Sequence, residues 1–528
     1  MQKGLTKHDF YLFKGVNAFG EENRIPYDSL FYAENCRFDG FRLTNRPGYQ
    51  AFYEGLSGGT NVKGLFNYPV YNHVLGNTEY LVAYYNSNFH RIDPNTMDVE
   101  TIAPTGWTAT DSAVEGLPYR DSLYVCDGNN LIGKITDTSF DVIADSPKAM
   151  FLETWLEKMW TVSSTAVSTV LYSRTATASN PEYIEDWTTV GGAGAELIGS
   201  GGRLTGLKKL NTSLYAFKAD AIEQFYDFDL SGVVPVAIHR PLAVTAGAVG
   251  QKSITLVEND IWFLTPDLEI RSLGQEANYS SESPRTRDLS NTLARYKKQL
   301  DPDQSGAVAV YHKGIFKLSL KTLGSASNNI KFVWDFNSKM WSFDKDTSQT
   351  NYCINTGNLY FVTDGLSEKI YRDNVGYSDN GFAMSWSATT GLFDDGSPDI
   401  KKHARYLVVR GKRSKGATIV LNLLGEDRQV LETHVIPEPT EAEMAVVDRE
   451  VEDAFLQFGD DLVGGFGYNG ESSDGPATYR FNVKFSCNSN SRMFGLKFDS
   501  SLNAKKVAID EAKIYYIPRG LNSYNITS

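Results

Sequence analysis

The feature that most constrains this chain is a β-hairpin that recurs along it at an even spacing. Its clearest copy spans residues 206–232, where Leu214-Tyr215 opens an apolar run, a polar turn follows at residues 218–220, and Ile222 begins the returning strand. One such hairpin is not stable alone in water, so it must pack on copies of itself. Aliphatic–aromatic or aromatic pairs mark the copies: Tyr84-Tyr85, Leu123-Tyr124, Met159-Trp160, Leu214-Tyr215, Ile261-Trp262, Ile315-Phe316 and Leu359-Tyr360.

These anchor pairs lie on average about 46 residues apart, which is the length of a four-stranded propeller blade. Asp-rich turns at residues 92–96, 135–139 and 334–338 are each followed by another strand, so the third and fourth strands of a blade are also visible. We therefore predict an all-β fold: a β-propeller with six or seven blades, followed by a β-sandwich domain. An irregular series of hairpins in a sandwich is the alternative.

The domain organisation follows from where the blade rhythm begins and stops. A chain of 528 residues is too long for one ordinary core. We assign residues 1–55 to an N-terminal arm whose segment 49–53 supplies the closing strand of the last blade, and residues 56–380 to the propeller. Residues 381–528 form the sandwich, with an acidic, glycine-rich insertion at 437–475. Its expected strands are 382–389, 404–410, 417–424, 429–436, 478–487, 493–498 and 508–517.

Composition narrows the class of protein. Hydrophobic residues make up 41% and aromatic residues 12% of the chain, which favours a strand-rich globular protein over disorder. The first residues contain no apolar signal-peptide core, and no run approaches the roughly 20 apolar residues of a membrane-spanning helix. We therefore expect synthesis in the cytosol and no membrane span. A bacterial surface or periplasmic propeller is disfavoured for the same reason.

Neither the cysteines nor the histidines form a recognisable local motif. Cys36, Cys126, Cys353 and Cys487 lie far apart without a CxxC pair, so we expect reduced thiols in the core. The seven histidines never lie two or four residues from one another, which gives a metal site no local support. We predict no metal and no cofactor.

Catalytic motifs are also missing from the sequence. It contains no G-x-S-x-G, no P-loop and no G-x-G-x-x-G that opens a helix. The nearest match to a sialidase repeat, at residues 472–479, is one residue short, has tyrosine in place of tryptophan and occurs once, outside the blades. We therefore predict no catalytic residues and a protein that is not an enzyme.

The charge distribution points to contacts with other macromolecules. The net charge of −13 argues against a protein that grips nucleic acid by its phosphates, but an acidic wall lets a polyanion slide past without sticking. The densest basic patch of the propeller lies on and before a helix expected at 291–300, capped by Ser290 and with Leu293, Tyr296 and Leu300 on its inner face. A second basic stretch, 401–415, and the acidic insertion can meet across a subunit boundary in a symmetric ring. The candidate subunit or DNA-channel contacts are Arg285, Arg287, Arg295, Lys297, Lys298, Lys401, Lys402, Arg413 and Lys415.

Taken in order, several short motifs resemble a known family. They are Phe38-Asp39-Gly40 leading to Arg46-Pro47-Gly48-Tyr49, Leu171-Tyr172-Ser173 with Asn180-Pro181-Glu182, the hairpin at 206–232, Trp262-Phe263-Leu264 with Ile270-Arg271, and Val333-Trp334-Asp335 with Trp341 before a terminal sandwich. In this order they resemble the propeller-bearing tail hub or nozzle proteins of tailed bacteriophages, which include the packaged-DNA stabilisation proteins of short-tailed phages. Residues 437–475 have no counterpart in that pattern.

The resemblance implies a structural protein of the virion tail, made in the host cytoplasm. Such a protein forms a homohexamer around the tail axis below the portal and its adaptor ring, retains the packaged double-stranded DNA, and lets it pass without sequence preference during genome ejection. The acidic chain suits a conduit of this kind.

A glycan- or receptor-binding propeller, including a tail-associated depolymerase, is the alternative. It predicts saccharide binding through exposed aromatic side chains such as Trp107, Trp187 or Trp341.

Overall fold

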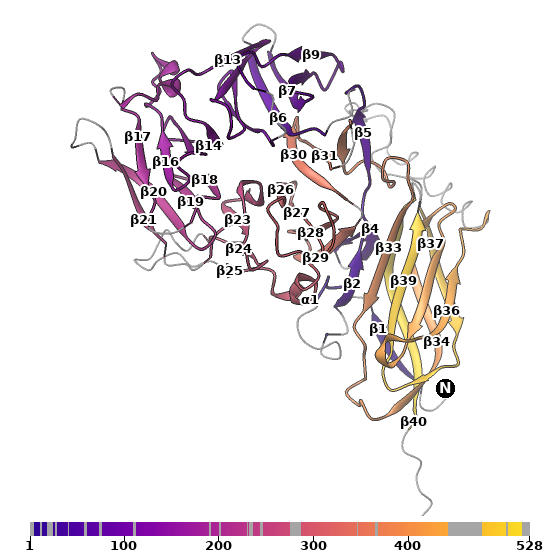
Figure 1. Cartoon of the computed structure of the whole chain (residues 1–528). Coiled ribbons are helices and arrows are strands. Elements are labelled where there is room, and N and C mark those ends of the chain that lie inside the picture. The colour runs from indigo at the N-terminus through magenta and orange to yellow at the C-terminus, as the bar shows by residue number, and fades with distance from the viewer. Residues whose placement is uncertain are drawn as a thin grey trace, which may run out of the picture.

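The computed structural model shows a propeller with a second β-domain at its side (Figure 1). It describes residues 5–10, 13–17, 25–26, 29–40, 42–56, 61–72, 76–108, 112–189, 192–199, 202–229, 231, 236–242, 246–274, 287–345, 347–364, 368–441, 478–502 and 505–519. Most of the acidic insertion therefore lies outside the described residues, as does Arg285. None of the described helices is long and apolar enough to cross a membrane.

Seven four-stranded antiparallel units make up the propeller; in the first six the strands pair in chain order, and the last takes its fourth strand from the N-terminal part of the chain. The first three blades are β6 to β9 (Gly64–Asn72, Gly76–Tyr85, Asn88–Ile92, Val99–Ile102), β10 to β13 (Glu115–Tyr119, Ser122–Cys126, Gly133–Thr136, Ser139–Val142) and β14 to β17 (Ala149–Trp155, Lys158–Ser163, Thr169–Tyr172, Gly194–Leu197). The next three are β18 to β21 (Gly206–Leu210, Ser213–Phe217, Ile222–Asp229, Val236–Pro241), β22 to β25 (Ile254–Val257, Asp260–Leu264, Ile270–Ser272, Arg287–Asp288) and β26 to β29 (Val308–His312, Ile315–Leu320, Ile330–Asp335, Met340–Lys345). The last blade is β30 to β32 (Gln349–Asn355, Asn358–Thr363, Ile370–Asp373) with β5 (Tyr49–Tyr53).

The ring is closed by a strand from the other end of the chain. The first strand of each blade contacts the first strand of the next, and β30 of the last blade contacts β6 of the first. The outer strand of the last blade is β5, which pairs antiparallel with β32, Tyr49 opposite Asp373 and Tyr53 opposite Ile370. The predicted closing strand at 49–53 is confirmed with the same bounds.

The anchor pairs of the sequence repeat all lie on the second strand of a blade. A second strand has a neighbour on each side and a packed blade above and below, so both of its faces are buried. All five residues of β19 and all six of β15 are buried for this reason. The predicted propeller is therefore confirmed, and each of its seven anchors marks one blade.

The Asp-rich turns also have the expected place. They connect the third and fourth strands, and the carboxylates of Asp93 and Asp335 accept the backbone N–H two residues on, each at 2.8 Å. The crossing after Leu171-Tyr172 is an insertion between β16 and β17 that contains the short 3₁₀ helix η2 (Pro181–Glu185).

Beside the propeller, two sheets face each other around one buried apolar cluster, as in a β-sandwich. Each of the seven strands predicted for this region has a counterpart in β33 (Met384–Thr390), β34 (Lys401–Ser414), β35 (Ile419–Leu424), β36 (Val430–Ile436), β37 (Thr478–Ser486), β39 (Gly495–Leu502) and β40 (Val507–Arg519). The short β38 (Asn490–Ser491) and the 3₁₀ helix η7 (Glu426–Arg428) complete it.

The N-terminal residues do not form one arm but are distributed between the two domains. The sandwich sheet β3-β4-β40-β34-β37 takes up β1 (Thr6–Phe10), β3 (Cys36–Asp39) and β4 (Arg42–Asn45). Between them, β2 (Leu30–Glu34) lies between β29 of the sixth blade and β33 of the sandwich. One nine-stranded sheet, β26-β27-β28-β29-β2-β33-β39-β35-β36, therefore runs from the propeller into the sandwich.

The helix expected at 291–300 is shorter and is capped differently. It consists of the 3₁₀ turn η6 (Asn291–Leu293) followed by α1 (Ala294–Lys297). Ser290 does not cap it through its side chain, because its hydroxyl donates to Asp288 and accepts the N–H of Ile270. The inner face is as predicted, since Leu293, Tyr296 and Leu300 are all buried. A second 3₁₀ turn, η4 (Gln251–Ser253), precedes β22.

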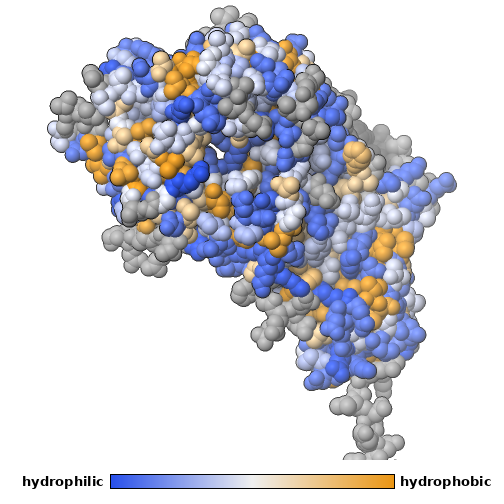
Figure 2. Space-filling model, viewed as in Figure 1, coloured by the Kyte–Doolittle hydropathy of each residue, from blue (hydrophilic) through white to orange (hydrophobic). Residues whose placement is uncertain are grey.

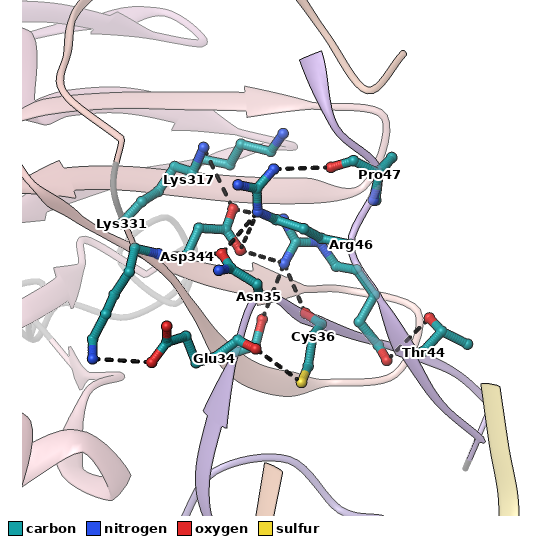
Figure 3. A network of polar contacts seen from close by, with 12 residues as sticks. Glu34, Asn35, Cys36, Thr44, Arg46, Pro47, Lys317, Lys331 and Asp344 are labelled. Carbon is teal, nitrogen blue, oxygen red and sulfur yellow. Dashed lines mark hydrogen bonds and ion pairs between the residues drawn. The ribbon is translucent and has the colours of Figure 1, made fainter. Parts of the chain in front are cut away.

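A buried carboxylate, Asp344 at the end of β29, joins the propeller to the sandwich (Figure 3). Arg37 on β3 donates two hydrogen bonds to its two oxygens, at 2.7 and 2.8 Å. The ammonium of Lys331 on β28 lies 3.4 Å from Asp344, and Nε of Arg46 lies 3.8 Å away. The surrounding cations hold the pKa of Asp344 well below its usual range despite its burial.

Arg46 extends this network to the segment between β32 of the last blade and β33 of the sandwich. Its guanidinium binds both carboxylate oxygens of Asp379, one of them at 2.9 Å, and its Nε donates to Asn35 at 2.9 Å. Asn35 in turn donates to the carbonyl of Ser385 in the sandwich. The N-terminal segment is thus bonded to the sixth blade, to the connection that follows the last blade, and to the sandwich.

We expect the substitution Asp344→Asn to destabilise the protein by about 3–5 kcal/mol, because it leaves Arg37 and the buried Lys331 without their carboxylate and removes one of the two carboxylates that face Arg46. The matched control is Asp510→Asn, whose partner Arg42 is partly exposed and whose loss should cost less than about 1 kcal/mol. Urea unfolding followed by tryptophan fluorescence measures both. Equal effects of the two substitutions would contradict a structural role for the network.

The pH dependence of stability gives a second prediction. Because the folded-state pKa of Asp344 lies below the value of about 4 for an unfolded aspartate, its contribution is complete above that pH and is lost as the pH falls toward the folded-state pKa. Between pH 5 and pH 3 the free energy of unfolding should therefore fall more steeply in the wild type than in Asp344→Asn. Parallel curves would show that this carboxylate does not couple to folding.

Candidate functional site

The first strands of the blades surround a cavity at the centre of the propeller. Its volume is about 350 Å³, and residues from the first strand of all seven blades line it, together with η4. The space-filling view is hollowed at the centre of the propeller, and the surface around this opening is largely hydrophilic (Figure 2). A central cavity is where propellers most often bind ligands, so it is the first candidate site.

Two carboxylates and two ammonium groups lie in this cavity and form pairs. Lys252 on η4 lies 3.8 Å from Glu115 on β10 and donates to the side-chain oxygen of Asn351 on β30 at 2.7 Å. Lys208 on β18 lies 3.8 Å from Glu153 on β14. The pairs connect different blades, so they tie the ring across its axis and between neighbours.

Burial acts on the charged groups of the cavity. It raises the pKa of Glu115, while the nearby ammonium groups of Lys252 and Lys208 oppose that rise. With two cations and two anions the lining is electrically balanced, and each charge already has a partner. Such a lining stabilises the ring more readily than it binds a strongly charged ligand.

Sequence reasoning did not single out these residues. One pattern in the sequence could have indicated them. It is a charged residue within the first strand of a blade, among neighbours that are mostly apolar or small. Glu115, Glu153 and Lys208 fit that description, but the seven strands converge only in the folded ring.

Two of the predicted contact residues are buried, and the prediction is wrong for them. Lys402 is 1% exposed, and its ammonium donates to the carbonyl oxygens of Ser397, Ile400 and Arg492, so it closes a loop. Arg413 is 2% exposed and lies over the ring of Phe481. The pairing of β34 with β40 shifts register twice, so the face that each basic residue occupies cannot be predicted from strict alternation along the sequence.

The other two contact residues predicted in this stretch, Lys401 and Lys415, lie far apart. Lys401 begins β34 and Lys415 follows its end, and both are exposed. A strand of this length separates them by roughly 45 Å at about 3.4 Å per residue. They offer two separate contact points rather than one basic surface.

The other predicted patch lies near the junction of the two domains. Arg295 lies over the ring of Phe31 and lines a cavity of about 250 Å³ with Tyr32, Tyr296 and Lys345. Lys297 lies 3.7 Å from Asp288, and Lys298 is exposed. The backbone of Arg287 lies in β25, while its side chain and all of Arg285 are outside the described residues.

The tryptophans expected to bind saccharides belong to the core. Trp341 is 2% exposed, so the expectation is wrong for it. Trp107 lies edge-on to Phe89 and Phe140, and its N–H donates to the carbonyl of Leu131. Trp187 is partly buried against an apolar cluster formed by the second blade, the third blade and the insertion of the third blade. The four cysteines are free and buried, as predicted.

No protein-family model matches this chain, and no curated protein matches its sequence. Among solved structures, similar chains include the WD40 β-propeller domain of Doa1 (8% identity, TM-score 0.38, covering 62% of this chain and 96% of that one) and BamB from Moraxella catarrhalis (10%, 0.37, 70% and 97%). A third is YCF48 bound to a D1 peptide (8%, 0.37, 65% and 97%). The propeller assignment above comes from the pairing of the strands.

We expect Lys252→Met to destabilise the ring by about 1–3 kcal/mol, because it leaves the Glu115 carboxylate and Asn351 without their shared donor. Lys369→Met is the control, since Lys369 pairs with Glu54 on the exposed rim and its loss should cost less than about 1 kcal/mol. A double-mutant cycle with Glu115→Gln isolates the pairwise energy. Additive effects in that cycle would show that the cavity pair does not stabilise the blades.

Proposed function

We propose that this chain is a structural subunit of a bacteriophage tail, a hub that assembles as a hexameric ring and forms a conduit for packaged DNA. The subunit acts through contacts and shape, without catalysis. It retains the genome below the portal and adaptor and lets it pass during ejection. The proposal extends the family resemblance of the sequence to the architecture of the folded chain.

The rigid connection of propeller and sandwich carries this proposal. A nine-stranded sheet runs through both domains, and the Asp344 network fixes the N-terminal segment between them. Two domains joined in this way transmit force as one body, whereas domains joined by a linker turn independently. A tail component under the pressure of packaged DNA needs that stiffness.

The charges of the chain also agree with a passive conduit. The charged residues that the structure describes in the central cavity form balanced pairs, so this lining offers a polyanion no excess of positive charge. The net charge of −13 disfavours adhesion of DNA to any wall that these subunits form. Exposed Lys298, Lys401 and Lys415 remain as points of contact with neighbouring subunits.

The purified protein is expected to form a hexamer that higher salt loosens, because charged contacts between subunits are screened. Mass photometry over a range of salt concentrations, with negative-stain electron microscopy, measures the assembly. Lys298→Glu and Lys415→Glu should weaken it, while Lys148→Glu, an exposed lysine on a loop of the third blade, serves as the control. A monomer in low and high salt, at all protein concentrations, would contradict the ring.

The place of the protein in the particle is tested separately. Gold-labelled antibody on intact virus particles from its source should mark the tail axis near the portal vertex. Label on peripheral fibres would favour the glycan- or receptor-binding alternative, which a glycan array then tests directly. Absence of label from particles would contradict a tail role of either kind.

A further inference from the structure

Three potential metal ligands lie together at the open edge of the sandwich. Glu432 and His434 lie two residues apart on β36, so their side chains share one face of that strand. Cys487 follows the end of β37. β36 is the last strand of the nine-stranded sheet, and β37 is the last strand of the other sandwich sheet, β3-β4-β40-β34-β37. The three side chains therefore meet where the edges of the two sheets lie together.

Their spacing fits tetrahedral coordination. Nε2 of His434 lies 3.7 Å from Sγ of Cys487 and 3.3 Å from Oε2 of Glu432, and all three atoms lie within 4.8 Å of one another. A zinc ion bound at ordinary distances holds its sulfur and nitrogen ligands about 3.6 Å apart and its nitrogen and oxygen ligands about 3.4 Å apart. The two distances that involve His434 therefore differ little from those of a bound state.

Neighbouring groups hold the ligands in this arrangement. The second carboxylate oxygen of Glu432 accepts the backbone N–H of Asn488 at 2.7 Å and the hydroxyl of Ser489, which leaves Oε2 directed at the histidine. The ring of His434 stacks on Phe485, with centroids 4.8 Å apart. Hydrogen bonds and packing of this kind are what orient ligands in metal sites.

We propose that Glu432, His434 and Cys487 form a zinc-binding site that clips the two sheets of the sandwich together. A thiolate, an imidazole and a carboxylate suit Zn²⁺, whereas Mg²⁺ and Ca²⁺ require oxygen ligands throughout. Three protein ligands leave the fourth position to water. The site does not depend on the proposed tail function.

Access and protonation set how the ion binds. The side chains of His434 and Glu432 are 15% and 21% exposed, so an ion from solvent can reach them. A free cysteine thiol is protonated at neutral pH, whereas zinc binds the thiolate. Binding forms the Zn–S bond and releases this proton to solvent, and the affinity for zinc should therefore rise with pH.

Titration of the full-length protein with CoCl₂ tests the site through a thiolate-to-cobalt charge-transfer band, and competition with a chromophoric chelator then gives the affinity for ZnCl₂. We expect about one zinc per chain, displacing the cobalt band, and a higher melting temperature with zinc. Cys487→Ala and His434→Asn should each weaken zinc binding by at least about 100-fold and remove the zinc-dependent gain in melting temperature.

Matched controls distinguish this site from other cysteines and histidines. Cys353→Ala removes a buried thiol in the last blade, and His90→Asn removes a half-buried histidine in the first, so neither should change zinc binding. Absence of a charge-transfer band in the wild type would overturn the proposal even if a variant fails to fold. Zinc binding that is as tight in Cys487→Ala as in the wild type would also overturn it, because the ion would then lie elsewhere.

Discussion

The Asp344 carboxylate is the interaction on which the placement of the two domains depends. It sits at the end of the sixth blade, takes two hydrogen bonds from Arg37 of the sandwich and faces Lys331 and Arg46. Burying so many charges is costly, and the cost is offset only if every member keeps its partner. The arrangement therefore tolerates little displacement, so its main effect is to fix the position of the two domains relative to each other. The nine-stranded sheet supplies the continuity, and the ionic network fixes the angle at which it continues.

The sequence predicted the repeating part of the fold well because the repeat is local. Each blade is a series of short hairpins, and the anchor pairs mark the strand that is buried on both faces, so periodicity alone places them. The strand at 49–53 was also predictable, since an isolated edge must be covered. The route of residues 6–45 was not, because strands in this stretch pair with residues hundreds of positions away, such as Glu34 with Phe343 and His8 with Ile514.

The candidate sites were hard to predict for the same reason, because their residues come together only in the folded chain. A run of basic residues in the sequence predicts a basic surface only when the side chains share one exposed face. In this stretch Lys402 and Arg413 are buried, while Lys401 and Lys415 are exposed. The charges of the central cavity come from strands of different blades, and the ligands at the sandwich edge come from two sheets. A search restricted to histidine spacing missed Glu432-x-His434, because the residue two positions before the histidine is a carboxylate and the third proposed ligand, Cys487, lies 53 residues after the histidine.

The closing strand also has a consequence for the order in which the molecule acquires its structure. During synthesis β5 leaves the ribosome before the other strands of the propeller, yet its partner β32 emerges about 300 residues later. Until then the last blade lacks its outer strand and the ring is open. Joining segments so far apart carries a large entropic cost and slows folding. The first six blades can form one after another as they emerge. The propeller is complete only when β5, which is made before the other propeller strands, pairs with β32, which is made last.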